Sequence, residues 1–129
     1  MSLSGPGGRG KPQRDHRWAP DRGEMIWIDH LPQSGREMAG QHPFLVLSPR
    51  AFNVKTGLVI GCAMSSRQAH NPFAVANPRD PTKESYILAD QPKSFDWRKR
   101  RAKRHAWGKV TAEVLQEVCD RLNAIVQLA

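Results

Sequence analysis

The chain of 129 residues contains no long hydrophobic run. No stretch of about 18 apolar residues is present, which argues against a membrane-spanning helix. The first twenty residues also lack the apolar centre that a secretion signal requires. We therefore expect a soluble protein that stays in the cytoplasm and does not enter a membrane.

Cysteine is also scarce, and Cys62 and Cys119 are its two occurrences. They form neither a CxxC pair nor a cluster with histidine, which are the usual patterns of protein metal sites. We expect both thiols to be reduced and buried as small apolar side chains. We expect no metal and no cofactor.

Acidic residues are few, with 12 Asp and Glu against 20 Lys and Arg, so the formal net charge is +8. Eight cations and a single anion lie between Lys93 and Lys109. A protein this basic often binds a polyanion, and contacts with a nucleic acid backbone would make that binding salt-sensitive. Charge alone does not distinguish RNA from DNA, phospholipid or an acidic protein, and a solvated basic surface is the alternative.

The length suits one folded domain with an adequate core. Residues 1–19 are rich in glycine, proline and cations, so we expect a disordered basic tail there and a folded domain over residues 20–129. Short segments bounded by turn-forming residues predict strands at 24–29, 44–48, 57–64, 73–76, 85–89 and about 103–110. Their close spacing favours a small β-barrel over a parallel sheet.

The last segment has a helical pattern that begins after Thr111, a suitable N-cap. The apolar positions at helical spacing are Val114, Leu115, Val118, Cys119, Leu122, Ile125 and Val126. We expect this side of the helix to lie on the barrel. The expected solvent face consists of Glu113, Glu117, Asp120 and Arg121.

Residues 32–40, between the first two expected strands, form a polar loop rich in turn-forming residues. Loops held between rigid strands commonly carry functional side chains. The candidates in and beside this loop are Ser34, Arg36, Glu37, Gln41 and His42. The alternative is a solvated hairpin without a chemical role.

Several further motifs extend along the chain in a consistent order. They are PDRGEMIWID (20–29), PQSGREMAG (32–40), HPFLVLSP (42–49), FNVKTG (52–57), SSR (65–67), NPF (71–73) and LADQPKSFDWRKRRA (88–102). On these motifs, which together cover roughly residues 20–128, the chain resembles the MazF/PemK family of toxin endoribonucleases from bacterial toxin–antitoxin pairs.

The resemblance implies a mainly β fold, a small SH3-like β-barrel of the MazF/PemK type with short helices and a C-terminal amphipathic helix. It also implies a homodimer whose shared groove binds single-stranded RNA and cleaves it at short sequences without a metal. The products would carry a cyclic phosphate and a free 5′ hydroxyl. The second implied partner is a small antitoxin that covers the basic surface with an acidic segment.

The family resemblance also assigns candidate site residues. It pairs an arginine just before the HPFLVLSP-type strand with a threonine or serine after the third strand. Ser65 matches the second position, whereas His42 stands at the arginine position. We expect His42, Ser65 and Glu37 to be catalytic, with Glu37 as a base or base reader unless it is a surface residue. The expected RNA-binding residues are Ser34, Arg36, Gln41, Asn53, Lys55, Arg67, Asp90, Gln91 and Lys93.

Histidine changes the chemistry of this position. An arginine stays charged and grips two phosphate oxygens but shuttles protons poorly, whereas histidine, with an ordinary pKa of about 6.5, exchanges protons at neutral pH and is charged only part of the time. In one outcome, His42 is the general acid or base and a separate cation supplies the charge. The candidate cations are Arg36, Arg67 and Lys55.

Other outcomes remain open. In the second outcome, cleavage is lost and the groove only binds RNA or an antitoxin. In the third, His42 packs beside Pro43 and neighbouring groups act in its place. A further alternative, drawn from the resemblance of this barrel to gyrase-poisoning toxins, is a protein that binds a topoisomerase.

Overall fold

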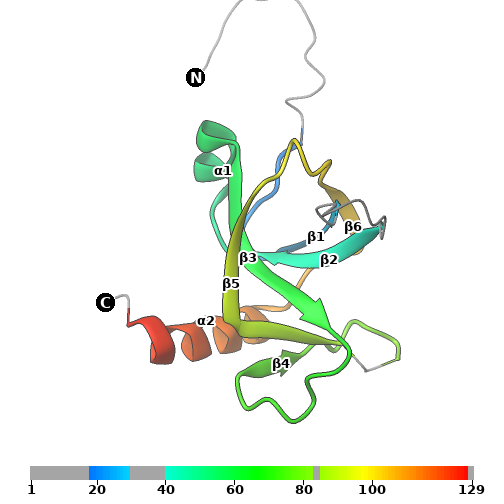
Figure 1. Ribbon diagram of the computed structural model, residues 1–129, viewed down its shortest axis with the longest axis vertical. Helices are drawn as coiled ribbons and strands as arrows, with labels where there is room; N and C mark the ends of the chain where they lie inside the picture. The colour runs from blue at the N-terminus through cyan, green and yellow to red at the C-terminus, as the bar shows by residue number, and fades with distance from the viewer. Residues whose placement is uncertain (1–17, 30–39, 83–84, 128–129) are drawn as a thin grey trace, which may run out of the picture.

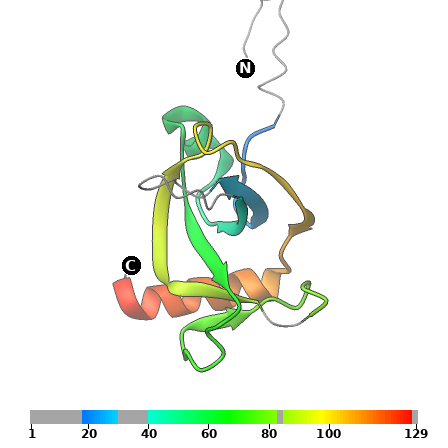
Figure 2. The ribbon, with the colours of Figure 1, turned by 45° about the vertical axis from the view of Figure 1, so that its right-hand side comes forward.

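The computed structural model describes residues 18–29, 40–82 and 85–127. Its elements are β1 (Glu24–Asp29), β2 (Gln41–Val46), α1 (Arg50–Thr56), β3 (Leu58–Ser65), β4 (Ala74–Ala76), β5 (Tyr86–Asp96), β6 (Lys103–Lys109) and α2 (Ala112–Val126). The strands pair antiparallel in one sheet of order β4-β5-β3-β2-β1-β6. The sheet is strongly curled and α2 lies along it (Figure 1), and a view turned by 45° shows the strands wrapping around an interior (Figure 2). The predicted mainly β, barrel-like fold class is confirmed.

Two strands extend beyond their expected bounds. β2 begins at Gln41 rather than at residue 44, and β5 continues to Asp96 rather than ending at residue 89. These stretches contain proline and polar residues, which favour turns locally, but pairing with neighbouring strands keeps them extended. The helix α1, for which no range was predicted, ends at Gly57, whose left-handed backbone (φ 77°) donates its N–H to Asn53 O.

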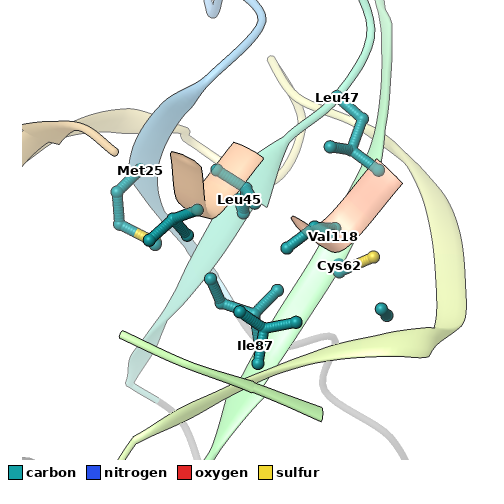
Figure 3. Packing of buried hydrophobic residues seen from close by; sticks show 9 residues of the cluster. Met25, Leu45, Leu47, Cys62, Ile87 and Val118 are labelled. Atoms are coloured by element: carbon teal, nitrogen blue, oxygen red, sulfur yellow. The ribbon is translucent and has the colours of Figure 1, made fainter. Parts of the chain in front are cut away.

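One face of the sheet carries a first cluster of buried apolar residues beneath α2. Figure 3 shows Met25 of β1, Leu45 of β2, Cys62 of β3, Ile87 of β5 and Val118 of α2 converging in this cluster. Removal of these side chains from water is the main stabilising contribution to such a core. Val75 of β4 also belongs to the cluster, which therefore joins α2 to five strands of the sheet.

The helix α2 confirms most of the expected pattern. Thr111 caps it by accepting a hydrogen bond from the backbone N–H of Val114 at 3.2 Å. Val114 and Val118 are buried against the sheet, as predicted. Ile125 and Val126 were expected on the barrel but are 45% and 47% exposed, so the last helical turn lies outside the core. No described helix is long and apolar enough to cross a membrane.

The two cysteines differ in their surroundings. Cys62 is fully buried, as predicted, and burial raises the pKa of its thiol to about 12, with smaller coulombic contributions from Asp90 and Cys119. Cys119 is only half-buried, so the prediction of burial is wrong for this residue. Its Sγ accepts a hydrogen bond from Arg22 Nη2 at 3.5 Å. Both thiols are free.

The opposite face of the sheet carries a second cluster, which also sets where the fold begins. It contains Ala19, Ile26, Ile28, Phe44, Val46, Val59 and Trp97. Trp18 packs edge-on against Trp97, with ring centroids 6.0 Å apart. Trp18 and Ala19 were expected in the tail, but their apolar side chains belong to this cluster, so the folded part begins before residue 20. The rest of the expected tail, residues 1–17, lies outside the described residues.

Asn53 of α1 is fully buried and links four parts of the chain. Its Nδ2 donates to Pro20 O at 2.8 Å and to Ser48 O at 3.0 Å, and its Oδ1 accepts from Ser48 Oγ at 2.6 Å. Its backbone oxygen accepts from Trp97 Nε1 at 2.8 Å. Because the amide is buried and bonded within the protein, the prediction that Asn53 binds RNA is wrong, and the residue is structural.

Substitution of this asparagine should destabilise the fold. In Asn53→Ala the carbonyls of Pro20 and Ser48 lose a buried donor, so we expect the free energy of unfolding in urea to fall by about 2–4 kcal/mol. Asn123→Ala, at an exposed position of α2, is the control and should leave stability nearly unchanged. An Asn53→Ala protein of native stability would contradict the structural role.

His105 of β6 is buried between two indole rings. Its ring centroid lies 4.2 Å from those of both Trp27 and Trp107, with interplanar angles of 19° and 30°. Its Nδ1 accepts the backbone N–H of Trp107 at 3.1 Å. Burial lowers the pKa of His105, because the charged imidazolium would lose its hydration. The folded protein therefore favours the neutral imidazole.

This preference predicts a pH-dependent stability. Below a pH of about 6.5 the unfolded state protonates His105 more readily than the folded state, so acidification should lower the free energy of unfolding. In His105→Phe, which keeps an aromatic ring but cannot titrate, the loss between pH about 7.5 and about 5.5 should be smaller. Urea unfolding of both proteins at the two pH values measures this difference. Equal pH dependence would show that His105 does not contribute.

Candidate active site

The two residues expected at the centre of the site, His42 and Ser65, lie at the same end of the β2–β3 pair. The paired segment of these strands ends at Phe44 opposite Ala63. His42 lies two residues before Phe44 and Ser65 two residues after Ala63, so both extend past the paired segment. Figure 1 shows β2 and β3 separating towards these ends.

The alternation of side chains along the strands places both residues on one face. Phe44 belongs to the second cluster and Ala63 packs against it, and residues two positions apart in a strand share a face. His42 is exposed and Ser65 is half-buried, so both are open to a ligand from solvent. The structure thus brings the two predicted catalytic residues to one face and one end of the sheet.

Ser65 begins the turn that leads out of β3. Its Oγ accepts the backbone N–H of Arg67 at 3.1 Å, a short turn motif typical of serine. A hydroxyl that accepts in this way still has its O–H to donate, for example to a phosphate oxygen. Arg67 lies in the same turn as the candidate serine, and its side chain is exposed.

Asp90 and Gln91 lie in an irregular part of β5 close to this turn. Between the pairs Cys62–Pro92 and Met64–Ile87 the register shifts, so several residues of β5 stand opposite one residue of β3. Asn71 Nδ2 lies 3.3 Å and 3.5 Å from the two carboxylate oxygens of Asp90 and connects β5 to the segment after Ser65. Gln91 and Lys93 are exposed further along the strand.

At the other side of the site, Gln41 is tied to the end of β1. Its Nε2 donates to Asp29 Oδ1 at 2.9 Å, and Arg101 Nε donates to Asp29 Oδ2 at 2.8 Å. Both hydrogen bonds lower the pKa of Asp29 below its usual range, and the bond from Arg101 makes the larger contribution. The carboxylate thereby connects the start of β2 to the turn after β5.

Some predicted residues are not brought to this end. Lys55 lies in α1, which joins the end of β2 to the start of β3, so it sits at the opposite end of the pair from His42 and Ser65. Within one copy of the chain it is therefore not placed to supply charge beside His42. Ser34, Arg36 and Glu37 lie outside the described residues.

One residue that sequence reasoning did not single out is Arg100. It lies in a run of cations that indicates only a basic surface, and no feature of the run marks one arginine from another. In the structure Arg100 is half-buried, with Nη1 donating to Asp29 O at 3.2 Å and its guanidinium 4.1 Å from the ring centroid of Phe95. Its packing sets it apart from its exposed neighbours.

These groups combine a hydroxyl, an imidazole and several cations around one end of the sheet. Such a set can donate to an anionic phosphate, move a proton and stabilise added negative charge. Within the described ranges, no three His, Cys, Asp or Glu side chains are grouped to hold a metal ion. The chemistry most readily served is that of phosphate esters.

Comparison with known proteins places the chain among toxins. The family described as PemK-like, MazF-like toxin of type II toxin–antitoxin system matches residues 21–126. Endoribonuclease toxin MazF of Escherichia coli K12 is 36% identical over 110 residues, which cover 85% of this chain and 96% of the relative. Endoribonuclease PemK of Escherichia coli is 33% identical over 113 residues, covering 82% of this chain and 81% of the relative.

A solved structure of similar fold is the MazE–MazF complex (Form-III) from Deinococcus radiodurans, with a TM-score of 0.76 and 38% identity over 87% of this chain and 100% of that chain. The matches in sequence and in fold thus span nearly the whole described chain. The chain belongs to the PemK-like, MazF-like toxin family of type II toxin–antitoxin systems.

Proposed function

We propose that this chain is an endoribonuclease toxin that cleaves single-stranded RNA at short sequences without a metal. The observation that carries the proposal is the placement of His42 and Ser65 past the paired segment of β2 and β3, on one face of the sheet. Relatives of similar length are named endoribonucleases. A homodimer, implied by the family resemblance, and the cytoplasmic location expected from the sequence belong to the same proposal.

The proposed reaction uses the RNA's own 2′ hydroxyl. The 2′ oxygen attacks the adjacent phosphorus and loses its proton, while the bond from phosphorus to the 5′ oxygen breaks and that oxygen gains a proton. His42 and Glu37 are the proposed groups for the two proton transfers. Ser65 donates its O–H to a phosphate oxygen, and nearby cations stabilise the charge that builds on phosphorus. The products are a cyclic phosphate and a free 5′ hydroxyl.

The proposed protein partner is an antitoxin with an acidic segment. Exposed cations are concentrated in the turn after β5 and at the start of β6. They are Arg98, Lys99, Arg101, Lys103 and Arg104. Such a surface attracts an acidic chain and speeds its association at low salt. The solved MazE–MazF complex is a relative in which a toxin of this fold is bound to its partner.

Cleavage should resist a chelator and depend on Ser65. We expect the purified chain to cut a mixed RNA pool equally well with and without EDTA and to leave cyclic phosphate ends, which mapping of the cut ends detects. Ser65→Ala should lower the cleavage rate by about 100-fold, because a donor to the phosphorane is lost. Ser66→Ala, at the exposed neighbouring position, is the matched control and should remain active. Loss of all cutting in EDTA would indicate a different kind of nuclease.

Substitution of His42 distinguishes the proposed enzyme from the alternative, a module that binds RNA or an antitoxin without cleaving. If the imidazole transfers a proton, His42→Arg should lower the cleavage rate by about 10- to 100-fold, since arginine is a poor proton shuttle. The measurement is the initial rate on the most strongly cut RNA of the pool. Activity gained by His42→Arg in a chain that is otherwise inactive would instead support the binding module. Inhibition of gyrase in a supercoiling assay, without RNA cleavage, would support the topoisomerase alternative.

A further inference from the structure

Three aromatic side chains from β1 and β6 form a continuous ladder of stacked rings. The ring centroid of His105 lies 4.2 Å from that of Trp27 and 4.2 Å from that of Trp107. The planes of the two indoles are inclined by 19° and 30° to the imidazole plane, so one tryptophan covers each face of the histidine. The rings therefore follow one another in the order Trp107, His105, Trp27.

An irregularity of β6 brings these rings together. The register between β1 and β6 shifts between Glu24 and Ile26, where β6 contains extra residues. Beside this irregularity the backbone N–H of Trp107 donates to Nδ1 of His105 at 3.1 Å. The hydrogen bond fixes the plane of the buried imidazole, so the fold itself orders the ladder and a ligand need not do so.

Trp27 is the outer end of the ladder. Trp107 packs against the first cluster, whereas in the described part of the chain Trp27 packs against neither cluster. The indole of Trp27 is only half-buried, although His105 stacks on one of its faces. Its exposed part is therefore aromatic surface that neither core of the protein uses.

The surroundings of Trp27 suit a polyanion. Trp27 is opposite Lys103 in the register of β1 and β6, and paired residues share a face, so an exposed cation lies beside the indole. Asp29 lies two residues further along β1, and its carboxylate oxygens accept from Gln41 and Arg101, the second of which offsets its charge. An aromatic ring beside a cation can bind a base and a phosphate of a single nucleic acid strand.

This position is separate from the candidate cleavage centre. Ile26 and Ile28, the neighbours of Trp27 in β1, belong to the second cluster, on the face that carries His42. Because side chains alternate along a strand, the indole of Trp27 lies on the opposite face of the sheet. Its role in RNA binding would therefore be to hold a nucleotide other than the one that is cut.

We propose that Trp27 stacks on a base of single-stranded RNA and extends the ladder by one ring, while Lys103 binds a neighbouring phosphate. The inference rests on the proposed function, because it takes RNA as the ligand. Every base has a flat face that can stack on an indole, so this site adds affinity without selecting a sequence. It is a second RNA contact, on the face of the sheet away from His42 and Ser65.

The test compares two probes that cannot be cut. The first is a pool of single-stranded 2′-O-methyl oligonucleotides of about ten nucleotides, and the second has the same backbone and length but no bases. Trp27→Leu keeps an apolar side chain and removes the ring, so it should weaken the dissociation constant for the first probe about 10-fold. Binding of the abasic probe should change less than about 2-fold, because it has no base to stack.

Lys103→Gln is the matched control, because Lys103 is the residue opposite Trp27 in the sheet. It removes a charge and leaves the ring, so it should weaken the binding of both probes equally, by about 3-fold. Urea unfolding of each variant separates binding losses from unfolding. If Trp27→Leu does not fold, Trp27→Phe replaces it, with an expected loss of about 3-fold for the probe with bases and none for the abasic probe.

Two results would overturn the inference. Unchanged binding of both probes in the Trp27 variant would mean that the ladder is structural or receives a protein segment instead of RNA. Equal losses for the two probes would mean that Trp27 acts by shaping the basic surface and not by stacking. A chain that binds the first probe through Trp27 but cleaves no RNA would refute the proposed enzyme and leave the stacking site in place. RNA cleavage with probe binding that does not depend on Trp27 would do the reverse.

Discussion

The buried side chain of Asn53 is the constraint on which the arrangement of the site depends. Its hydrogen bonds tie α1 to the segment before β1 and to the end of β2, while its carbonyl receives the indole N–H of Trp97. A buried amide with all these partners is costly to disturb, because each partner would be left unpaired. One end of the β2–β3 pair is thereby locked, and the other end is left to carry His42 and Ser65.

A second constraint holds β2 and β3 close together. A Cβ atom at Gly61 would lie 1.9 Å from the backbone oxygen of Leu45, so only glycine permits the observed approach of the two strands. Beyond Phe44 and Ala63 this tight pairing stops. The candidate catalytic residues thus lie just beyond the closely paired segment of the two strands. Such a platform suits a site that must position a flexible RNA strand.

Several features of this site could be predicted from sequence because their signals are local or lie in continuous motifs. The alternation of β1, the helical spacing of α2 and its Thr111 cap are examples. His42 and Ser65 were found through motifs in register with a known family, and the structure places them at one end of the sheet. The length of β5 was not predictable in this way, because its second half is extended by pairing with β3 and not by its own preferences.

Sequence alone determined the basic charge, the short strands, the final helix and the family, since each depends on residue type and order along the chain. Tertiary structure alone decided what individual polar residues do. The sequence predicts that Asn53 contacts RNA and does not distinguish Arg100 from its neighbours, yet folding buries the Asn53 amide completely and leaves Arg100 half-buried beside β1. The reason is physical: the partners of both side chains are distant in the chain, and no local pattern specifies such contacts.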